Sequence, residues 1–342
     1  MLTSKKYLLP HSGKFYKANL HCHSTVSDGE LTPEELKKIY KEQGYSILAY
    51  TNHDVLISHA ELADENFLPL NGYEMEINER SDRPFDYIRT CHICLIALKP
   101  DNLTQVCYHR GDYLFSNAVH YRDKVKYDHT LPDYVRTYTP ECINDIIKTG
   151  RENGFFVTYN HPSWSLENYE QYTKYTGMNA MEICNYGCFS SGHLDYNEKE
   201  YDDMLRCGKR IYCIGADDNH NHADPNSKAW DSFGAFTMIK ADLLAYEAVT
   251  DALQNGNFYA SQGPEIYDLW FENGKVKITC SAAERIVYST TYRKKQVAYG
   301  DENGVKEAEF AVDPREGYFR ITVTDHAGRH ANTNAYFMDT LF

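Results

Sequence analysis

Short apolar runs alternate with amphipathic stretches from about residue 17 to residue 262. Segment 32–40 begins with a capping Thr32 and a first-turn Pro33, and then places its apolar residues on one face, which predicts a helix. Alternation of this kind is typical of an α/β fold in which helices surround a parallel sheet or barrel. A second helix is predicted over 139–147, and buried strands are predicted at 46–51, 155–159 and 210–215.

The pattern changes after Gly263 and Pro264. Short alternating strands are predicted at 275–279, 285–288 and 318–323, with Asn-Gly turns between them. We therefore expect a first domain over 1–264 and a small antiparallel β-sandwich over 265–342. We interpret the sandwich as a structural cap, with sugar or protein binding as the alternative.

The stretch from 100 to 140 is rich in Tyr, His and Arg and lacks a clean periodicity. It is longer than an ordinary connection, so we interpret it as an elaboration over the functional site, such as a lid.

The composition is that of a globular protein, with 42% hydrophobic and 25% charged residues among 342. Acidic residues exceed basic residues by 14, which disfavours nucleic acid as a partner. The apolar stretches are too short to span a bilayer, and the first residues do not resemble a secretory signal, so a cytoplasmic location is expected.

The ten cysteines have irregular spacing, which favours reduced, buried thiols over a disulfide framework. The pairs Cys91/Cys94 and Cys184/Cys188 leave zinc or redox chemistry as an alternative, although neither has a second pair at a suitable spacing.

Histidines and carboxylates gather at the ends of the predicted strands. His21 and His23 follow a short apolar segment, and on an extended chain both imidazoles point to one face and can bind one cation. Imidazole and carboxylate ligands together suit Zn, Mn or Fe, and their number here exceeds the needs of one tetrahedral ion. A multinuclear metal centre is therefore predicted. Its further candidate ligands are Asp28, His53, Glu74, His92, His161, Asp218 and His220.

These residues, in this order, resemble the PHP family, the polymerase and histidinol phosphatase domain. The resemblance covers about residues 18–262, and it implies a distorted (β/α)7 barrel that holds up to three divalent ions. The motifs that carry it are His21-x-His23-x4-Asp28-Gly29, His53-Asp54, Glu74, His92, His161-Pro162 and Asp218-x-His220. The resemblance implies a first ion on His21, His23, Glu74 and Asp218, a second on Glu74, His92 and His161, and a third on Asp28, His53 and His220.

At one position this chain departs from the family pattern, and at two others a neighbouring carboxylate is an alternative ligand. Many relatives have His where this chain has Asp28, and an aspartate makes the third site more tolerant of Mg or Mn. Asp217 is an alternative to Asp218, but only Asp218 stands two residues before a histidine, as the family motif requires. Glu76 is an alternative to Glu74, because it could face the same side of a strand.

The resemblance and the ligand set together predict a metal-dependent hydrolase of phosphate esters, such as a phosphatase acting on a small phosphorylated metabolite or nucleotide. A metal-activated hydroxide would attack phosphorus, with Glu74 joining two ions and His53 or His220 stabilising the leaving oxygen. Asp54 is expected to orient a ligand histidine. The candidates for substrate binding are Arg110, Arg122 and Arg136, which could clamp a phosphate, and Glu182, for which a plain salt bridge is the alternative.

Two other functions stay open at this point. One is hydrolysis of a non-phosphate bond by an amidohydrolase-like centre, although no lysine stands where that superfamily carries its bridging ligand. The other is a non-catalytic metal-binding scaffold, against which the full set of ligands counts. His109, His120 and His193 have no motif support and are interpreted as ordinary surface or core residues.

Overall fold

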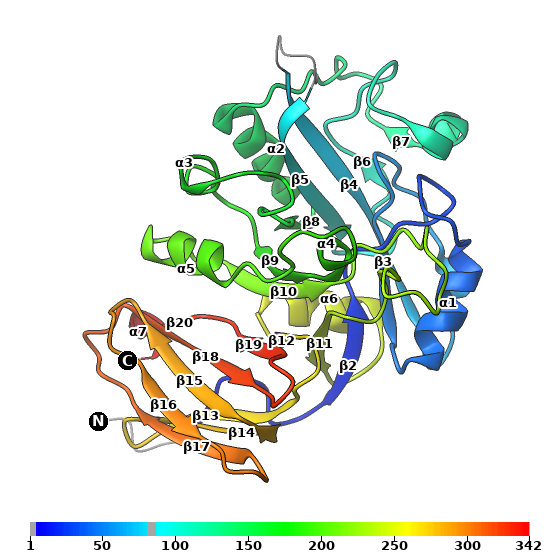
Figure 1. Cartoon of the computed structure of the whole chain (residues 1–342). Helices are drawn as coiled ribbons and strands as arrows, with labels where there is room; N and C mark the ends of the chain where they lie inside the picture. Colours follow the sequence, from blue (N-terminus) through cyan, green and yellow to red (C-terminus); the bar gives the residue numbers. More distant parts are fainter. Residues whose placement is uncertain (1–4, 81–86, 342) are drawn as a thin grey trace.

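One long sheet runs through most of the molecule (Figure 1). The computed structural model describes residues 5–80 and 87–341. The strands in the first half of the sheet are β2 (Lys14–Asn19), β3 (Ile47–Tyr50), β4 (Leu68–Arg80), β5 (Tyr87–Ala97), β8 (Phe155–Tyr159), β9 (Ala180–Asn185) and β10 (Tyr212–Ala216). Side by side, they follow the order β10-β9-β8-β5-β4-β3-β2. The strands predicted at 46–51, 155–159 and 210–215 are thus present as β3, β8 and β10.

Strand β5 runs against both of its neighbours. β2, β3 and β4 pair in parallel, as do β8, β9 and β10, whereas β5 is antiparallel to β4 and to β8. The prediction of a parallel sheet is therefore wrong at β5. The six residues between Arg80 and Tyr87 are too few for the crossover that two parallel strands need.

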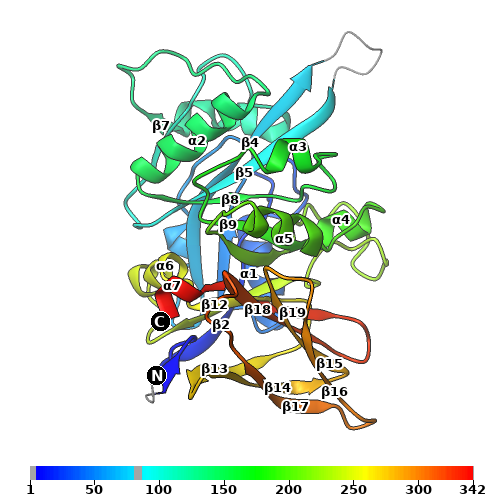
Figure 2. The ribbon, with the colours of Figure 1, turned by 90° about the vertical axis from the view of Figure 1, so that its left-hand side faces the viewer.

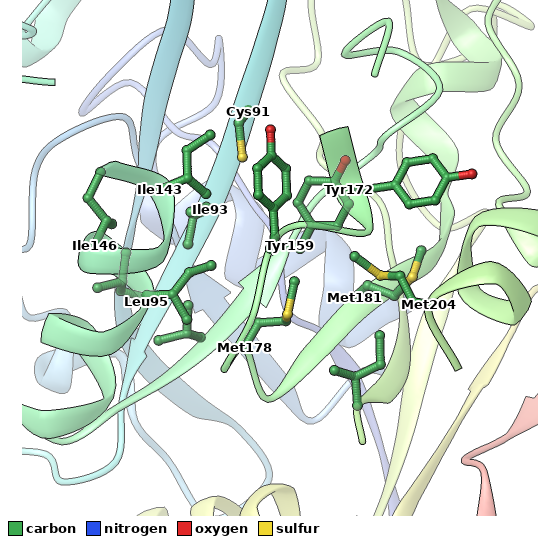
Figure 3. Packing of buried hydrophobic residues seen from close by; sticks show 14 of the residues in the cluster. Cys91, Ile93, Leu95, Ile143, Ile146, Tyr159, Tyr172, Met178, Met181 and Met204 are labelled. Carbon is green, nitrogen blue, oxygen red and sulfur yellow. The ribbon is translucent and has the colours of Figure 1, made fainter. Parts of the chain in front are cut away.

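The two predicted helices are present as α1 (Pro33–Glu42) and α2 (Pro140–Glu152). Thr32 and Glu35 form a reciprocal capping box at the start of α1, and Thr139 caps α2. α2 packs its apolar face, including the fully buried Ile143, against β5 and β8 (Figure 3). The other helical segments among the described residues are η1 (Ala60–Leu62), η2 (Ser116–Lys124), α3 (Tyr169–Tyr172), α4 (Tyr186–Ser190), α5 (Glu198–Arg206), α6 (Tyr246–Gln254) and α7 (Met338–Leu341).

The two ends of the seven-strand half approach each other just beyond β2 and β10. Cys22 forms an isolated parallel bridge with Asn219, and the Asp218 N–H donates to the His21 carbonyl at 2.9 Å. The sheet nevertheless continues from β2 to β11 (Phe236–Ala241) and β12 (Phe258–Ser261). The predicted α/β class is confirmed, and closure of these strands into a barrel stays a prediction.

The C-terminal part is a sandwich of two antiparallel layers (Figures 1 and 2). One layer consists of β1 (Lys6–Tyr7), β13 (Ile266–Glu272), β14 (Lys275–Ala283) and β17 (Val305–Ala311). The other continues the long sheet through β19 (His330–Thr333), β18 (Tyr318–Thr324), β15 (Arg285–Thr290) and β16 (Gln296–Tyr299), with β20 (Tyr336–Phe337) paired to β18. The long sheet thus crosses the boundary expected at residue 264, because β12 pairs with β19, and β1 adds a strand from the other end of the chain.

The stretch 100–140 contains β6 (Thr104–Gln105), η2 and β7 (Lys126–Tyr127). It is tied to the loops that follow β2 and β3. The Asn117 N–H donates to the Ser27 carbonyl at 3.0 Å, and the Gln105 side-chain amide donates to the Asp54 carbonyl at 2.9 Å. This elaboration therefore lies directly beside the segments that carry His23 and His53.

No helix in the described part of the chain is both long and apolar enough to cross a membrane. All ten cysteines lie within the described residues and are free thiols, and eight of them are buried.

Candidate metal centre

All nine predicted metal ligands come together at one edge of the seven-strand half. They reach it from the segments that follow β2, β3, β8 and β10 and from within β4 and β5. The ends of neighbouring parallel strands meet at one edge of a sheet, and residues far apart in sequence therefore become neighbours. The ligand atoms form overlapping groups, and the atoms of each group lie within 4.8 Å of one another.

The first group consists of His21, His23, Glu74 and Asp218. The Nε2 atoms of His21 and His23 are 3.1 Å apart. Each lies 3.2 Å from Glu74 Oε2 and 3.1 Å from Asp218 Oδ1. Four donor atoms therefore face a common point.

Glu74 also belongs to a second group, with His92 and His161. Its other oxygen, Oε1, lies 3.1 Å from His92 Nδ1 and 3.5 Å from His161 Nε2. Glu76 belongs to none of these groups. Its Oε1 lies 3.9 Å from His92 Nε2 and accepts a hydrogen bond from the Asn78 side-chain amide. The two oxygens of Glu74 therefore point to two different groups, which is the geometry of a bridging carboxylate.

The third group contains Asp28, His53 and His220, and His23 joins it. Asp28 Oδ2 lies 3.6 Å from His53 Nε2 and 3.4 Å from His220 Nε2, and Asp28 Oδ1 lies 3.5 Å from His23 Nδ1. His23 thus directs one ring nitrogen to the first group and the other to the third, a sharing that the sequence did not indicate.

Glu182 lies behind the first group. Its Oε1 is 2.7 Å from His21 Nδ1, and its Oε2 accepts hydrogen bonds from the His161 N–H and the Asn185 amide. The side chain is 0% exposed. Glu182 is therefore placed to orient His21, and the structure does not place it where a substrate could contact it.

Asp217 points away from the cluster. Its carboxylate accepts hydrogen bonds from the Tyr40 hydroxyl and from the N–H groups of Phe233, Gly234 and Ala235. Burial raises its pKa to about 7. Of the two adjacent aspartates, Asp218 is the one in the cluster, and Asp217 holds the following loop.

The cluster carries charges and unpaired atoms that a cation would satisfy. Burial by itself lowers the pKa of His23, but hydrogen bonds to Asp218 and Glu74 outweigh it and raise the pKa to about 9. Burial of Glu74 is likewise outweighed by the surrounding histidines, which hold its pKa well below the usual range. His53 Nδ1 and His92 Nε2 are buried and have no hydrogen-bond partner among the described residues. Buried polar atoms rarely stay unpaired, so this donor set fits bound divalent ions.

A cavity of about 550 Å³ opens over the cluster. Four of the residues that line it have no motif in the sequence that would have singled them out, since an isolated aromatic or hydroxyl side chain is common on any surface. These residues are Phe115, Trp164, Ser190 and Ser191. His222 also lines the cavity and forms a His-x-His pair with His220.

Asp54 and the three candidate arginines are not among the described residues that line the metal cavity. Within the described part of the chain, no hydrogen bond or ion pair joins the Asp54 side chain to a ligand histidine. It forms a buried, two-pronged ion pair with Arg136, whose guanidinium also donates to the Glu76 carbonyl at 3.1 Å. Arg136 thus joins the elaboration to the segment that carries His53. Arg110 and Arg122 line a separate cavity within the elaboration, and the described lining of the metal cavity includes no arginine.

The loop after β8, which carries His161 and Trp164, is anchored by Glu167. The buried Glu167 carboxylate accepts hydrogen bonds from the hydroxyls of Tyr138, Tyr159 and Tyr175. Burial outweighs these bonds and raises the pKa of Glu167 above its ordinary value of 4.5.

This raised pKa predicts a pH dependence of stability. Above about pH 4.5 the unfolded chain loses the Glu167 proton before the folded chain does, so the contribution of this group to stability falls as the pH rises through that window. Urea unfolding at a series of pH values should show that the free energy of unfolding of the wild type falls with rising pH, and that it falls less for Glu167→Gln. Identical pH profiles for the two proteins would contradict this.

No family profile matches the chain. Over 49 residues it is 49% identical to a 5'-3' exoribonuclease of Haemophilus influenzae, a match that covers 14% of this chain and 18% of that protein. The chain thus spans less than a fifth of the curated relative it matches.

Three solved structures are similar to the chain. A two-domain protein of Bacteroides vulgatus, described as containing a predicted PHP-like metal-dependent phosphoesterase, is 16% identical with a TM-score of 0.45, and 94% of each chain is covered. A candidate metal-dependent phosphoesterase of Bifidobacterium adolescentis is 17% identical with a TM-score of 0.41, covering 72% of this chain and 98% of that one. An amidohydrolase of Chromobacterium violaceum with bound sulfate is 19% identical with a TM-score of 0.39, covering 59% of this chain and 87% of that one. The first two descriptions name metal-dependent phosphoesterases, one of them PHP-like.

Proposed function

We propose that this protein is a metal-dependent phosphoesterase of the PHP type that hydrolyses a phosphate monoester of a small molecule. The observation that carries the proposal is the position of Glu74, whose two carboxylate oxygens face two separate groups of imidazole and carboxylate ligands. A bridging carboxylate between adjacent cation sites is a common arrangement where two ions share a phosphoryl substrate.

Three groups of residues would hold the ions. The first is His21, His23, Glu74 and Asp218, the second is Glu74, His92 and His161, and the third is Asp28, His53 and His220 together with His23. Zn, Mn and Fe suit these mixed donors, and Mg suits the third group through Asp28. Bound divalent ions would supply an acidified water and neutralise charge on the phosphoryl oxygens.

The side chains of the protein orient the ligand imidazoles and place charge beside the cavity. Glu182 fixes the ring of His21 through its Nδ1, so that Nε2 faces the first group. Asp28, His53 and His220 all line the cavity, so the positive charge that they would hold lies beside the space where the oxygen of a leaving group would be stabilised.

The test is a measurement of metal content and turnover on one sample. The full chain, purified without chelators, is analysed for bound metals and assayed against phosphorylated metabolites and nucleotides with and without added Mn. Two or three divalent ions per chain together with release of inorganic phosphate would support the proposal. Stoichiometric metal with no phosphate release from any member would favour hydrolysis of another bond or a scaffold role.

Glu182 offers a prediction about metal affinity. Glu182→Gln should lower the affinity of the chain for Zn by about 10- to 100-fold, because the neutral amide no longer holds and polarises the His21 ring. Competition with a chromogenic chelator measures the affinity. Glu247→Gln, at an exposed position of α6, is the matched control and should retain wild-type affinity. Equal affinities for Glu182→Gln and the wild type would contradict the role of Glu182.

A further inference from the structure

The elaboration contains a second cavity, of about 530 Å³, which we call the basic cavity. Its described lining shares no residue with that of the metal cavity. Its positively charged side chains outnumber its carboxylates, in a chain whose acidic residues exceed the basic ones by 14. The cationic residues that line it are Arg110, Arg122, Lys124 and Lys126, and the acidic residue is Asp123.

Most of the positive charge of the basic cavity is not neutralised within the described part of the chain. Arg110 pairs with Asp133 at 3.4 Å, and Arg122 donates to the Arg110 carbonyl. The ammonium groups of Lys124 and Lys126 form no ion pair with a described residue. Like charges around one space repel one another, so an anion bound among them lowers the electrostatic energy.

A buried hydroxyl in the lining of the basic cavity also lacks a partner. Tyr108 lines the cavity, is 8% exposed, and its hydroxyl has no hydrogen-bond partner among the described residues. Its ring packs on that of Tyr127, at a centroid distance of 4.5 Å. Buried hydroxyl groups are rarely left unpaired, and an O–H group can donate to an anion. The positive charge and the unpaired donor therefore indicate the same kind of ligand.

The wall of the basic cavity is held in place from behind. Tyr108 and Val125 both line it and pack in a buried apolar cluster. That cluster includes Val26 and Val55, from the loops after β2 and β3. The Tyr108 carbonyl also accepts a hydrogen bond from the Tyr134 N–H at 3.0 Å. A wall that is ordered before binding loses little conformational entropy when a ligand contacts it.

The donors of the basic cavity are of the kinds that bind phosphate, because guanidinium, ammonium and phenol groups all donate to phosphate oxygens. We propose that the basic cavity is a second ligand site, which binds a small molecule that carries two or more phosphate groups. The volume suits a small organic anion, whereas the acidity of the whole chain opposes a long polyanion such as a nucleic acid. Arg110 and Arg122, which the sequence suggested as a clamp for the substrate phosphate, thus belong to a site apart from the metal centre.

Calorimetry on the metal-loaded full chain tests the basic cavity. The probe is myo-inositol hexakissulfate, because sulfate groups resemble phosphate groups in shape and charge, bind metal ions weakly and are not cut by a phosphoesterase. The wild type should bind it with a stoichiometry of one. Lys124→Gln combined with Lys126→Gln should weaken binding by about tenfold or more, because two charges beside the ligand are lost. Tyr108→Phe, which removes only the hydroxyl, should weaken it by about tenfold.

Lys38→Gln combined with Lys306→Gln is the matched control. The two lysines are exposed, on α1 and β17, and neither lines the basic cavity. This control removes the same charge from the chain, so it should retain wild-type affinity for the probe. Equal weakening of binding in the control and in the lysine variant of the basic cavity would mean that only the overall charge matters, and it would overturn the proposal.

Three other results would also contradict the basic cavity as a ligand site of this kind. They are the absence of probe binding to the wild type, unchanged affinity in the variants of the cavity, and tighter binding of a single-stranded oligonucleotide than of the probe. The measurement needs no turnover, and the inference does not rest on the proposed function. Absence of phosphatase activity would therefore leave the basic cavity in place, and failure of the probe to bind would leave the phosphoesterase in place.

Discussion

Replacing Glu74 with glutamine should reduce phosphatase turnover by about 100- to 1,000-fold or more. The carboxylate is buried among five histidines, and its two oxygens face two ligand groups. An amide has no negative charge and only one oxygen, so it cannot serve both groups. Phosphate release at saturating substrate and Mn, with metal content determined on the same sample, measures the effect.

Glu76→Gln is the control for Glu74→Gln. Glu76 stands two residues along the same strand and lines the same cavity but belongs to none of the ligand groups. It should keep its bound metal and most of its turnover. Full activity of Glu74→Gln with a normal metal content would mean that the centre is not built around Glu74.

Replacing Arg320 with methionine should destabilise the protein by about 3–5 kcal/mol. Arg320 of β18 is 0% exposed and donates to Asp202 and Glu198 of α5, in each case at 2.7 Å. Its removal leaves the Asp202 carboxylate, which is nearly buried, with the Arg206 contact at 3.2 Å as its one remaining ion pair among the described residues. The ion pairs join the C-terminal sandwich to α5, so the loss of stability should appear as an unfolding midpoint at a lower urea concentration.

Two further variants make this stability prediction specific. Arg315→Met removes an exposed arginine that pairs with Asp313 two residues away, and it should leave the unfolding midpoint unchanged. Adding Asp202→Leu to Arg320→Met should recover part of the lost stability, because it removes the uncompensated charge. A midpoint for Arg320→Met equal to that of the wild type would contradict the prediction.

Local sequence patterns predicted the elements well where the physical cause is local. The Thr32 cap, its partner Glu35 and the apolar spacing along α1 all act within a few residues, and the helix begins where they place it. The expectation of a parallel sheet failed at β5, which the sequence patterns did not predict as a strand, because the alternation of strands and helices does not describe a strand that follows its neighbour after six residues. The continuity of the long sheet into the sandwich depends on β12 meeting β19, a pairing between distant segments.

The candidate metal centre likewise combines features that the sequence predicts with features that depend on contacts between distant segments. By itself, the sequence was enough to name the nine candidate ligands, because metal chemistry restricts ligands to a few side chains with recognisable spacing. The expectation that all of them follow strand ends was wrong for Glu74 and His92, which lie within β4 and β5. Only the tertiary structure decided which oxygen of Glu74 faces which group, that Asp218 and not Asp217 joins the cluster, and that His23 serves two groups. It also decided that Asp54 pairs with Arg136, that Glu182 lies behind His21, and that Phe115 and Trp164 border the cavity. The reason is physical: such contacts join residues that are far apart in the chain, and their geometry is fixed by the packing of whole elements and leaves no local trace in the sequence.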